Sequence, residues 1–153
     1  MSEISRVALF GKLNPLLYKA IEGATVFCKL RGNPYVELIH WMHQILSTND
    51  SDLHRIVRHF DLDASKLAAD LTRALDRLPR GATAISDLSE HIADSVERAW
   101  VYGTLKYGDS QVRSAYILVG LVKTMGLRNI LYGISREFEK IGIDALTDKL
   151  ADM

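Results

Sequence analysis

Apolar positions recur along the chain with the period of an α-helix, and the pattern of one half returns in the other. The segment 36–46 corresponds to 112–122, which lies 76 positions further on, and Gly32 and Gly108 close the segments before them. Repeats of this kind bury a continuous core by packing against each other. The duplication therefore predicts a docking platform in preference to a catalytic cleft.

Helical periodicity dominates, and no convincing run of strand alternation interrupts it. Asn14 and Asp63 are typical N-cap residues, and Pro15 suits the first turn of a helix. We predict an all-α fold of eight or nine helices, with two four-helix halves related by a pseudo-twofold axis and a short extra N-terminal helix. The whole chain, 1–153, forms one domain, in which the first repeat covers about 14–78 and the second about 86–150. The predicted helices are 4–11, 14–32, 37–46, 51–59, 63–78, 87–108, 111–125, 127–140 and 144–150.

Composition restricts the class of protein. At 153 residues the chain is long enough to bury about 70% of its unfolded surface as a single domain. Nineteen basic and nineteen acidic side chains balance, which disfavours a nucleic-acid partner. No run of about 18 apolar residues predicts a membrane span, and the start of the chain lacks the apolar stretch of a secretory signal. We expect a cytoplasmic domain without nucleic-acid or membrane partners.

Candidate chemistry is sparse. A phosphate-binding Gly-x-x-x-x-Gly-Lys-Ser/Thr loop is absent from the sequence, so ATP hydrolysis is not expected within these residues. Cys28 falls on an apolar helix face, as a small buried hydrophobe does. His40 and His43 stand three positions apart, but structural zinc prefers four Cys or His ligands. His54 and His59 do not share a helix face and are expected to point at solvent. We predict no catalytic residue, no metal site and no cofactor here.

The N-terminal segment is the candidate for binding. A helix of about eight residues does not persist alone in water, so Ile4, Val7 and Ala8 are expected to lie on the domain body. One interpretation is an ordinary docked tail. The other is one wall of a groove, in which the small residues Ala8 and Gly11 leave room for a partner helix with apolar anchors one turn apart.

The connection between the repeats supplies a second candidate wall. Pro79, Gly81 and their neighbours break the fifth predicted helix. Ile85 and Leu88 follow this stretch and are expected to be exposed. Periodicity alone does not establish that this connection meets the N-terminal segment.

The chain resembles the N-terminal domain of the Clp/Hsp100 AAA+ unfoldases, which is a tandem repeat of four-helix units. The residues that carry the resemblance are Val36 with His40-Trp41-Met42, Val112 with Tyr116-Ile117-Leu118, and the turns Leu62-Asp63 and Ile143-Asp144. Within the family, Leu9-Phe10-Gly11-Lys12-Leu13-Asn14-Pro15, the helix with Cys28, and His40-Trp41 are similar to the ClpV branch, which serves bacterial type VI secretion.

This resemblance implies a function. In that branch an added first helix forms a hydrophobic groove that receives an N-terminal helix of the sheath protein VipB, also called TssC. It implies a recognition module separate from its AAA+ motor, a hexameric parent that uses ATP and magnesium in the motor, and a monomeric isolated domain. The peptide-binding residues implied here are Ile4, Val7, Ala8, Gly11, Ile85 and Leu88.

Two alternatives remain open at this point. A general Clp chaperone domain would bind unfolded clients or adaptors. A small helical enzyme or metal protein would require a catalytic or metal-binding cluster.

Overall fold

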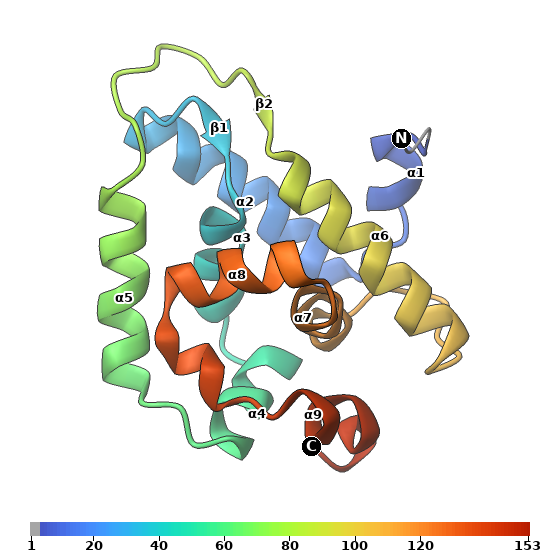
Figure 1. Cartoon of the computed structure of the whole chain (residues 1–153). Coiled ribbons are helices and arrows are strands. Elements are labelled where there is room, and N and C mark those ends of the chain that lie inside the picture. The colour runs from blue at the N-terminus through green and yellow to red at the C-terminus, as the bar shows by residue number, and fades with distance from the viewer. Residues whose placement is uncertain (1–3) are drawn as a thin grey trace.

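Helices make up nearly all of the regular secondary structure in the computed structural model, which describes residues 4–153 (Figure 1). Within these residues the chain forms nine α-helices, two 3-10 helices and two strands of two residues each. The elements are α1 (Arg6–Phe10), α2 (Pro15–Arg31), β1 (Tyr35–Val36), α3 (Leu38–Leu46), α4 (Asp52–His59), α5 (Ala64–Asp76), β2 (Asp87–Leu88), α6 (Glu90–Leu105), α7 (Ser114–Lys123), α8 (Met125–Ile134), η1 (Arg136–Lys140), α9 (Ile143–Asp148) and η2 (Leu150–Asp152).

Local sequence signals set several helix ends where they were predicted. The side chain of Asn14 accepts a hydrogen bond from the Leu17 N–H, and that of Asp63 accepts one from the Lys66 N–H. These bonds satisfy backbone donors that the first helical turn leaves without partners. Gly32 ends α2 in the left-handed region at φ 70°, which a residue without a Cβ atom adopts without strain.

Several helix boundaries in the second half differ from the prediction, including the starts of α6 and α7 and the end of α8. α6 begins at Glu90, after the N-cap Ser89, because Asp87 and Leu88 form β2. The start of α7 moves to Ser114, since Val112 pairs with another part of the backbone. α8 ends at Ile134, and the predicted remainder forms the 3-10 helix η1. The predicted all-α class is confirmed, and the two-residue strands β1 and β2 add only one short pairing to it.

The two backbone bridges relate the halves of the molecule. Val36 pairs in parallel with Leu88, and Leu13 pairs in parallel with Val112. In each bridge the N-cap residue that follows donates its N–H across the pair: Ser89 to Val36 at 2.8 Å and Asn14 to Val112 at 2.9 Å. The sequence repeat relates the segment before α2 to that before α6, and the segment before α3 to that before α7. The bridge between Leu13 and Val112 therefore corresponds to the bridge between Leu88 and Val36. This is the pseudo-twofold relation that the sequence repeat predicted.

One hydrophobic core runs through both halves of the domain. Trp41 is completely buried, and its indole N–H donates to the Leu17 carbonyl oxygen at 3.2 Å. Tyr116 is also buried, whereas Trp100 is only half-buried and packs at the edge of the core. The thiol of Cys28 lies inside this core, and burial raises its pKa. Cys28 is therefore a packed core residue, as its position in the sequence predicted.

No single helix within residues 4–153 is long and apolar enough to cross a membrane, while α7 and α8 qualify together but are bent by 111° at their junction.

Candidate functional site

α1 is a single helix of five residues at the edge of the molecule. The side chain of Ser5 caps it by accepting a hydrogen bond from the Ala8 N–H at 3.1 Å. Leu9 is 6% exposed and belongs to the core, and Phe10 packs against that core from a half-buried position. These apolar contacts hold the C-terminal turn of α1 on the domain body.

The orientation of α1 corrects the sequence prediction. Val7 is 86% exposed, Ile4 is 52% exposed, and Ala8 is exposed as well, so these residues do not lie on the body. A helix this short buries one narrow face, and the larger side chains of Leu9 and Phe10 occupy it. The apolar residues of the opposite face are available to another molecule.

Arg6 connects α1 to the second segment that the sequence singled out. Its guanidinium forms an ion pair with the Asp87 carboxylate, and Nη2 donates to the Leu88 carbonyl oxygen at 3.3 Å. The N–H of Leu88 and the Arg6 guanidinium both donate to Asp87 and lower the pKa of its carboxyl group. The N-terminal segment and the inter-repeat connection therefore meet in the structure.

The inter-repeat connection also differs from its prediction. Ile85 and Leu88 are half-buried and pack against the core, whereas exposure was expected. The reason is the pairing of β2 with β1, which places Leu88 beside Val36. Their side chains offer only a partial surface next to α1.

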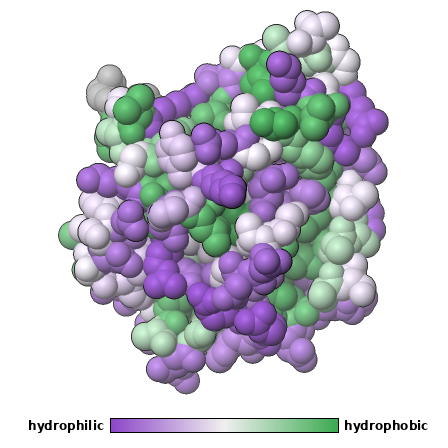
Figure 2. All heavy atoms as spheres, turned by 180° about the vertical axis from the view of Figure 1, so that it is seen from behind, coloured by the Kyte–Doolittle hydropathy of each residue, from purple (hydrophilic) through white to green (hydrophobic). Residues whose placement is uncertain are grey.

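Hydrophobic side chains gather at the corner that α1 occupies in the space-filling view from behind (Figure 2). A second hydrophobic patch lies on the same face over the C-terminal half of α2, where Val26 is 60% and Leu30 is 80% exposed. This face therefore combines the exposed side of α1 with further apolar surface.

A shallow hollow of about 500 Å³ lies where α1 meets α2. Gly11, one of the predicted binding residues, lies on its edge and is exposed. The sequence analysis did not predict the other residues that line this hollow. Tyr18 could have indicated them, because it is a large aromatic residue opposite the apolar face of its helix, and in the structure it is 47% exposed. The lining residues are Phe10, Gly11, Leu13, Pro15, Tyr18, Lys19, Glu22 and Gln111.

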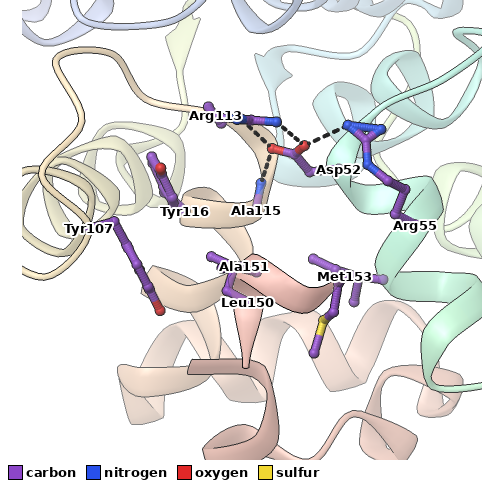
Figure 3. A pocket seen from close by; sticks show the side chains of 10 residues that line it. Asp52, Arg55, Tyr107, Arg113, Ala115, Tyr116, Leu150, Ala151 and Met153 are labelled. Atoms are coloured by element: carbon purple, nitrogen blue, oxygen red, sulfur yellow. Dashed lines mark hydrogen bonds and ion pairs between the residues drawn. The ribbon is translucent and has the colours of Figure 1, made fainter. Parts of the chain in front are cut away.

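A second hollow, of about 420 Å³, lies among α4, the start of α7 and η2 (Figure 3). The Asp52 carboxylate there accepts two bonds from Arg113, one from Arg55 and one from the Ala115 N–H. Four donors occupy the positions at which a carboxylate accepts hydrogen bonds. Asp52 is therefore a cross-link between elements and is not arranged as a general base.

Tyr116 closes one side of this hollow. Burial, and then its hydrogen bond to Asp109, raise the pKa of Tyr116 to about 12. Its ring stacks on that of Tyr107, with the centroids 5.2 Å apart. The phenol is thus a neutral hydrogen-bond donor and a packing surface at neutral pH.

His40 has both ring nitrogens hydrogen-bonded within the fold, whereas the buried Nδ1 of His43 has no hydrogen-bond partner in the part of the chain that the structure describes. His40 is completely buried; its Nδ1 accepts the Glu37 N–H and its Nε2 bonds to Asn33 Oδ1, both at 2.8 Å. Burial, Arg31 and His43 lower the pKa of His40 to about 4. The ring of His43 stacks on Phe27 at 4.8 Å. Among residues 4–153, no three His, Cys, Asp or Glu side chains group as metal ligands do.

His54 does not follow its prediction. Its ring nitrogens lie 2.7 Å from the Ser51 hydroxyl and 3.1 Å from the Leu46 carbonyl oxygen, so the side chain folds back against the start of α4. His59 is exposed, as expected.

The fold is a pair of four-helix units with an added first helix. Residues 12–134 match the Clp repeat (R) N-terminal domain family, and the chain belongs to this family. It is 65% identical over 149 residues to the AAA+ ATPase ClpV1 of Pseudomonas aeruginosa, covering 97% of this chain and 16% of that protein. It is 50% identical over 144 residues to the chaperone protein ClpB of Yersinia enterocolitica, covering 94% of this chain and 16% of that protein.

Solved structures agree with this assignment. A chain from work on the coevolution of the ATPase ClpV, the TssB-TssC sheath and the accessory HsiE protein matches with a TM-score of 0.96 and 64% identity, covering 99% of this chain and 94% of that one. The complex of a ClpV N-domain with a VipB peptide matches with a TM-score of 0.73 at 20% identity, covering 97% of this chain and 94% of that one. At that identity the second match establishes the fold.

Proposed function

We propose that this domain recognises substrate for a ClpV-like AAA+ unfoldase and binds an amphipathic N-terminal helix of the type VI sheath protein VipB/TssC. The observation that carries the proposal is the outward apolar face of α1, with Val7 86% exposed on a helix that Leu9 fixes to the body. An apolar helix face laid along such a wall is an established mode of peptide recognition.

The proposed contact surface starts from the exposed side of α1. Ile4, Val7 and Ala8 provide its apolar contacts, and Gly11 leads into the adjoining hollow. Ile85 and Leu88 contribute the exposed parts of their half-buried side chains at the end fixed by Arg6. A contact surface of this kind supports roughly micromolar affinity, about −8 kcal/mol.

The chain spans 16% of the length of each curated relative it matches, which supports a larger parent protein. We propose that the parent is a cytoplasmic homohexameric ATPase whose AAA+ modules bind ATP and magnesium, and that the isolated domain is a monomer without cofactor or catalytic site. Six copies on one ring would raise the effective affinity through avidity. The pulling force for disassembly of contracted sheath would come from the motor.

Calorimetric titration of the domain with a sheath-derived helical peptide tests the proposal. Val7→Asp is expected to weaken binding at least tenfold, the factor that corresponds to about 1.4 kcal/mol, because it places a carboxylate against the apolar face of the peptide. The fold should persist, since Val7 is exposed. Met125→Asp is the matched control: Met125 is 69% exposed at the start of α8, where an acidic residue is well tolerated. Equal peptide affinity of Val7→Asp and the wild type would refute the proposed contact surface on α1.

A second function is favoured by the similarity to a chaperone named ClpB. In that case the domain would bind unfolded clients or adaptors. Affinity for a permanently unfolded polypeptide, together with indifference to the sheath helix, would select this function.

A further inference from the structure

We infer that Arg6 is a positioning residue that holds α1 in place as the wall of the binding site by tying it to Asp87 and the Leu88 carbonyl oxygen. This inference rests on the proposed function. It assigns to Arg6 no contact with the peptide.

The first reason is the length of α1. A helix of five residues has too few internal hydrogen bonds to persist alone in water. Its C-terminal turn is anchored by the buried side chain of Leu9 and the half-buried ring of Phe10. Its N-terminal turn carries the exposed Val7 and requires a different anchor to keep one orientation.

The second reason is the rigidity of the segment that Arg6 grips. β2 pairs with β1, and the next residue, Ser89, caps α6 and donates its N–H to the Val36 carbonyl oxygen at 2.8 Å. The guanidinium thus reaches across 81 positions of sequence to a strand fixed in both halves of the domain. Two of its nitrogens donate, one to a side chain and one to the backbone, so the arginine sets orientation as well as distance.

The third reason is the location of Arg6 relative to the proposed contacts. Arg6 precedes Val7, the most exposed apolar residue of α1, and its side chain turns to the neighbouring strand. If this turn is already ordered before the peptide binds, binding loses less conformational entropy and is therefore tighter. Loss of the contact should therefore lower affinity although Arg6 itself lies outside the peptide interface.

Hydrogen exchange and peptide affinity, measured on Arg6→Ala, test the inference together. Alanine is the strongest helix former, so the change removes the contact without lowering helix propensity. We expect faster exchange of the Leu9 and Gly11 amides, which donate to the Ser5 and Val7 carbonyl oxygens, with no change in the melting temperature of the domain. Affinity for the sheath-derived helical peptide should fall about two- to fivefold, the range that one partly exposed ion pair supports.

Two further variants separate positioning from a general effect of charge. Arg136→Ala removes a different arginine from its ion pair, with Glu139, and should change neither readout. Asp87→Arg should loosen α1, and the exchanged pair of Arg6→Asp with Asp87→Arg should restore much of its protection and of the affinity.

The possible results distinguish the two proposals. If Arg6→Ala binds the peptide as tightly as the wild type does and its α1 amides exchange hydrogen at the wild-type rate, the positioning role is overturned and the proposed function still stands. Faster exchange with unchanged affinity would overturn the positioning role as well. Absence of wild-type binding to the peptide would overturn the proposed function and, with it, the role of Arg6.

Discussion

Asp52 and Arg113 form a two-point ion pair between the halves of the domain, with Nε to Oδ2 at 2.9 Å and Nη2 to Oδ1 at 2.6 Å. Asp52 begins α4 of the first half, and Arg113 precedes α7 of the second. The same carboxylate accepts the Ala115 N–H and therefore caps α7, because the N-cap residue Arg113 makes no capping bond to the backbone with its own side chain. One side chain thus cross-links two helix N-termini (Figure 3).

Replacement of Asp52 by Ala should lower the free energy of unfolding by about 2–3 kcal/mol, because charge-assisted hydrogen bonds at a side chain only 12% exposed are lost. Asp50→Ala is the matched control, since Asp50 bonds the neighbouring Arg55 from a side chain that is 65% exposed. Its effect should stay below about 1 kcal/mol. Urea unfolding of both variants measures the difference, and equal effects would show that the cross-link contributes nothing beyond a surface ion pair.

His40 should make the stability of the domain depend on pH. Its pKa is about 4 in the folded state and near 6.5 when unfolded, so the unfolded chain binds the extra proton first as pH falls. The stability that the domain gains from neutral His40 is complete above about pH 6.5. It decreases progressively as the pH falls to about 4, where the loss amounts to roughly 3 kcal/mol.

Denaturant unfolding between pH 4 and pH 7, performed on the wild type and on His40→Gln, measures this dependence. The glutamine variant is less stable at neutral pH but lacks the titration, so the difference between the two proteins should shrink as pH falls. A constant difference over this range would mean that His40 titrates normally in the fold. His59→Gln, at an exposed position, should follow the wild-type curve.

Gly103 should be sensitive to the addition of a single methyl group. A Cβ atom there would lie 2.7 Å from Cδ2 of Tyr116, whose ring is stacked on Tyr107 and whose hydroxyl bonds Asp109. Because the stacking and the hydrogen bond both hold the Tyr116 ring in place, Gly103→Ala is expected to destabilise the domain by about 1–3 kcal/mol.

Gly126 provides the control for this substitution. A Cβ atom added at Gly126 would meet nothing within 4 Å, so Gly126→Ala should be neutral or should stabilise α8 by up to about 1 kcal/mol. Thermal melting of both variants compares them directly. A gain in stability for Gly103→Ala would show that the α6–α7 contact accommodates extra volume.

The candidate site could be predicted in part. The sequence singled out the N-terminal segment and the connection near Leu88, and the structure joins them through Arg6 and Asp87. It did not predict which face of α1 points outward, because Leu9 and Val7 both fit a short amphipathic pattern. A helix of five residues has too few positions for periodicity to select a face.

The sequence by itself determined the all-α class, the duplication and the helix ends at Asn14, Gly32 and Asp63, since these depend on interactions within a few residues along one helix. Only the tertiary structure decided that the segments before α2 and α6 pair with those before α7 and α3, and that α1 turns Val7 outward. Such pairings join residues more than 50 positions apart, and the choice among partners depends on how the two halves pack, which no local pattern encodes.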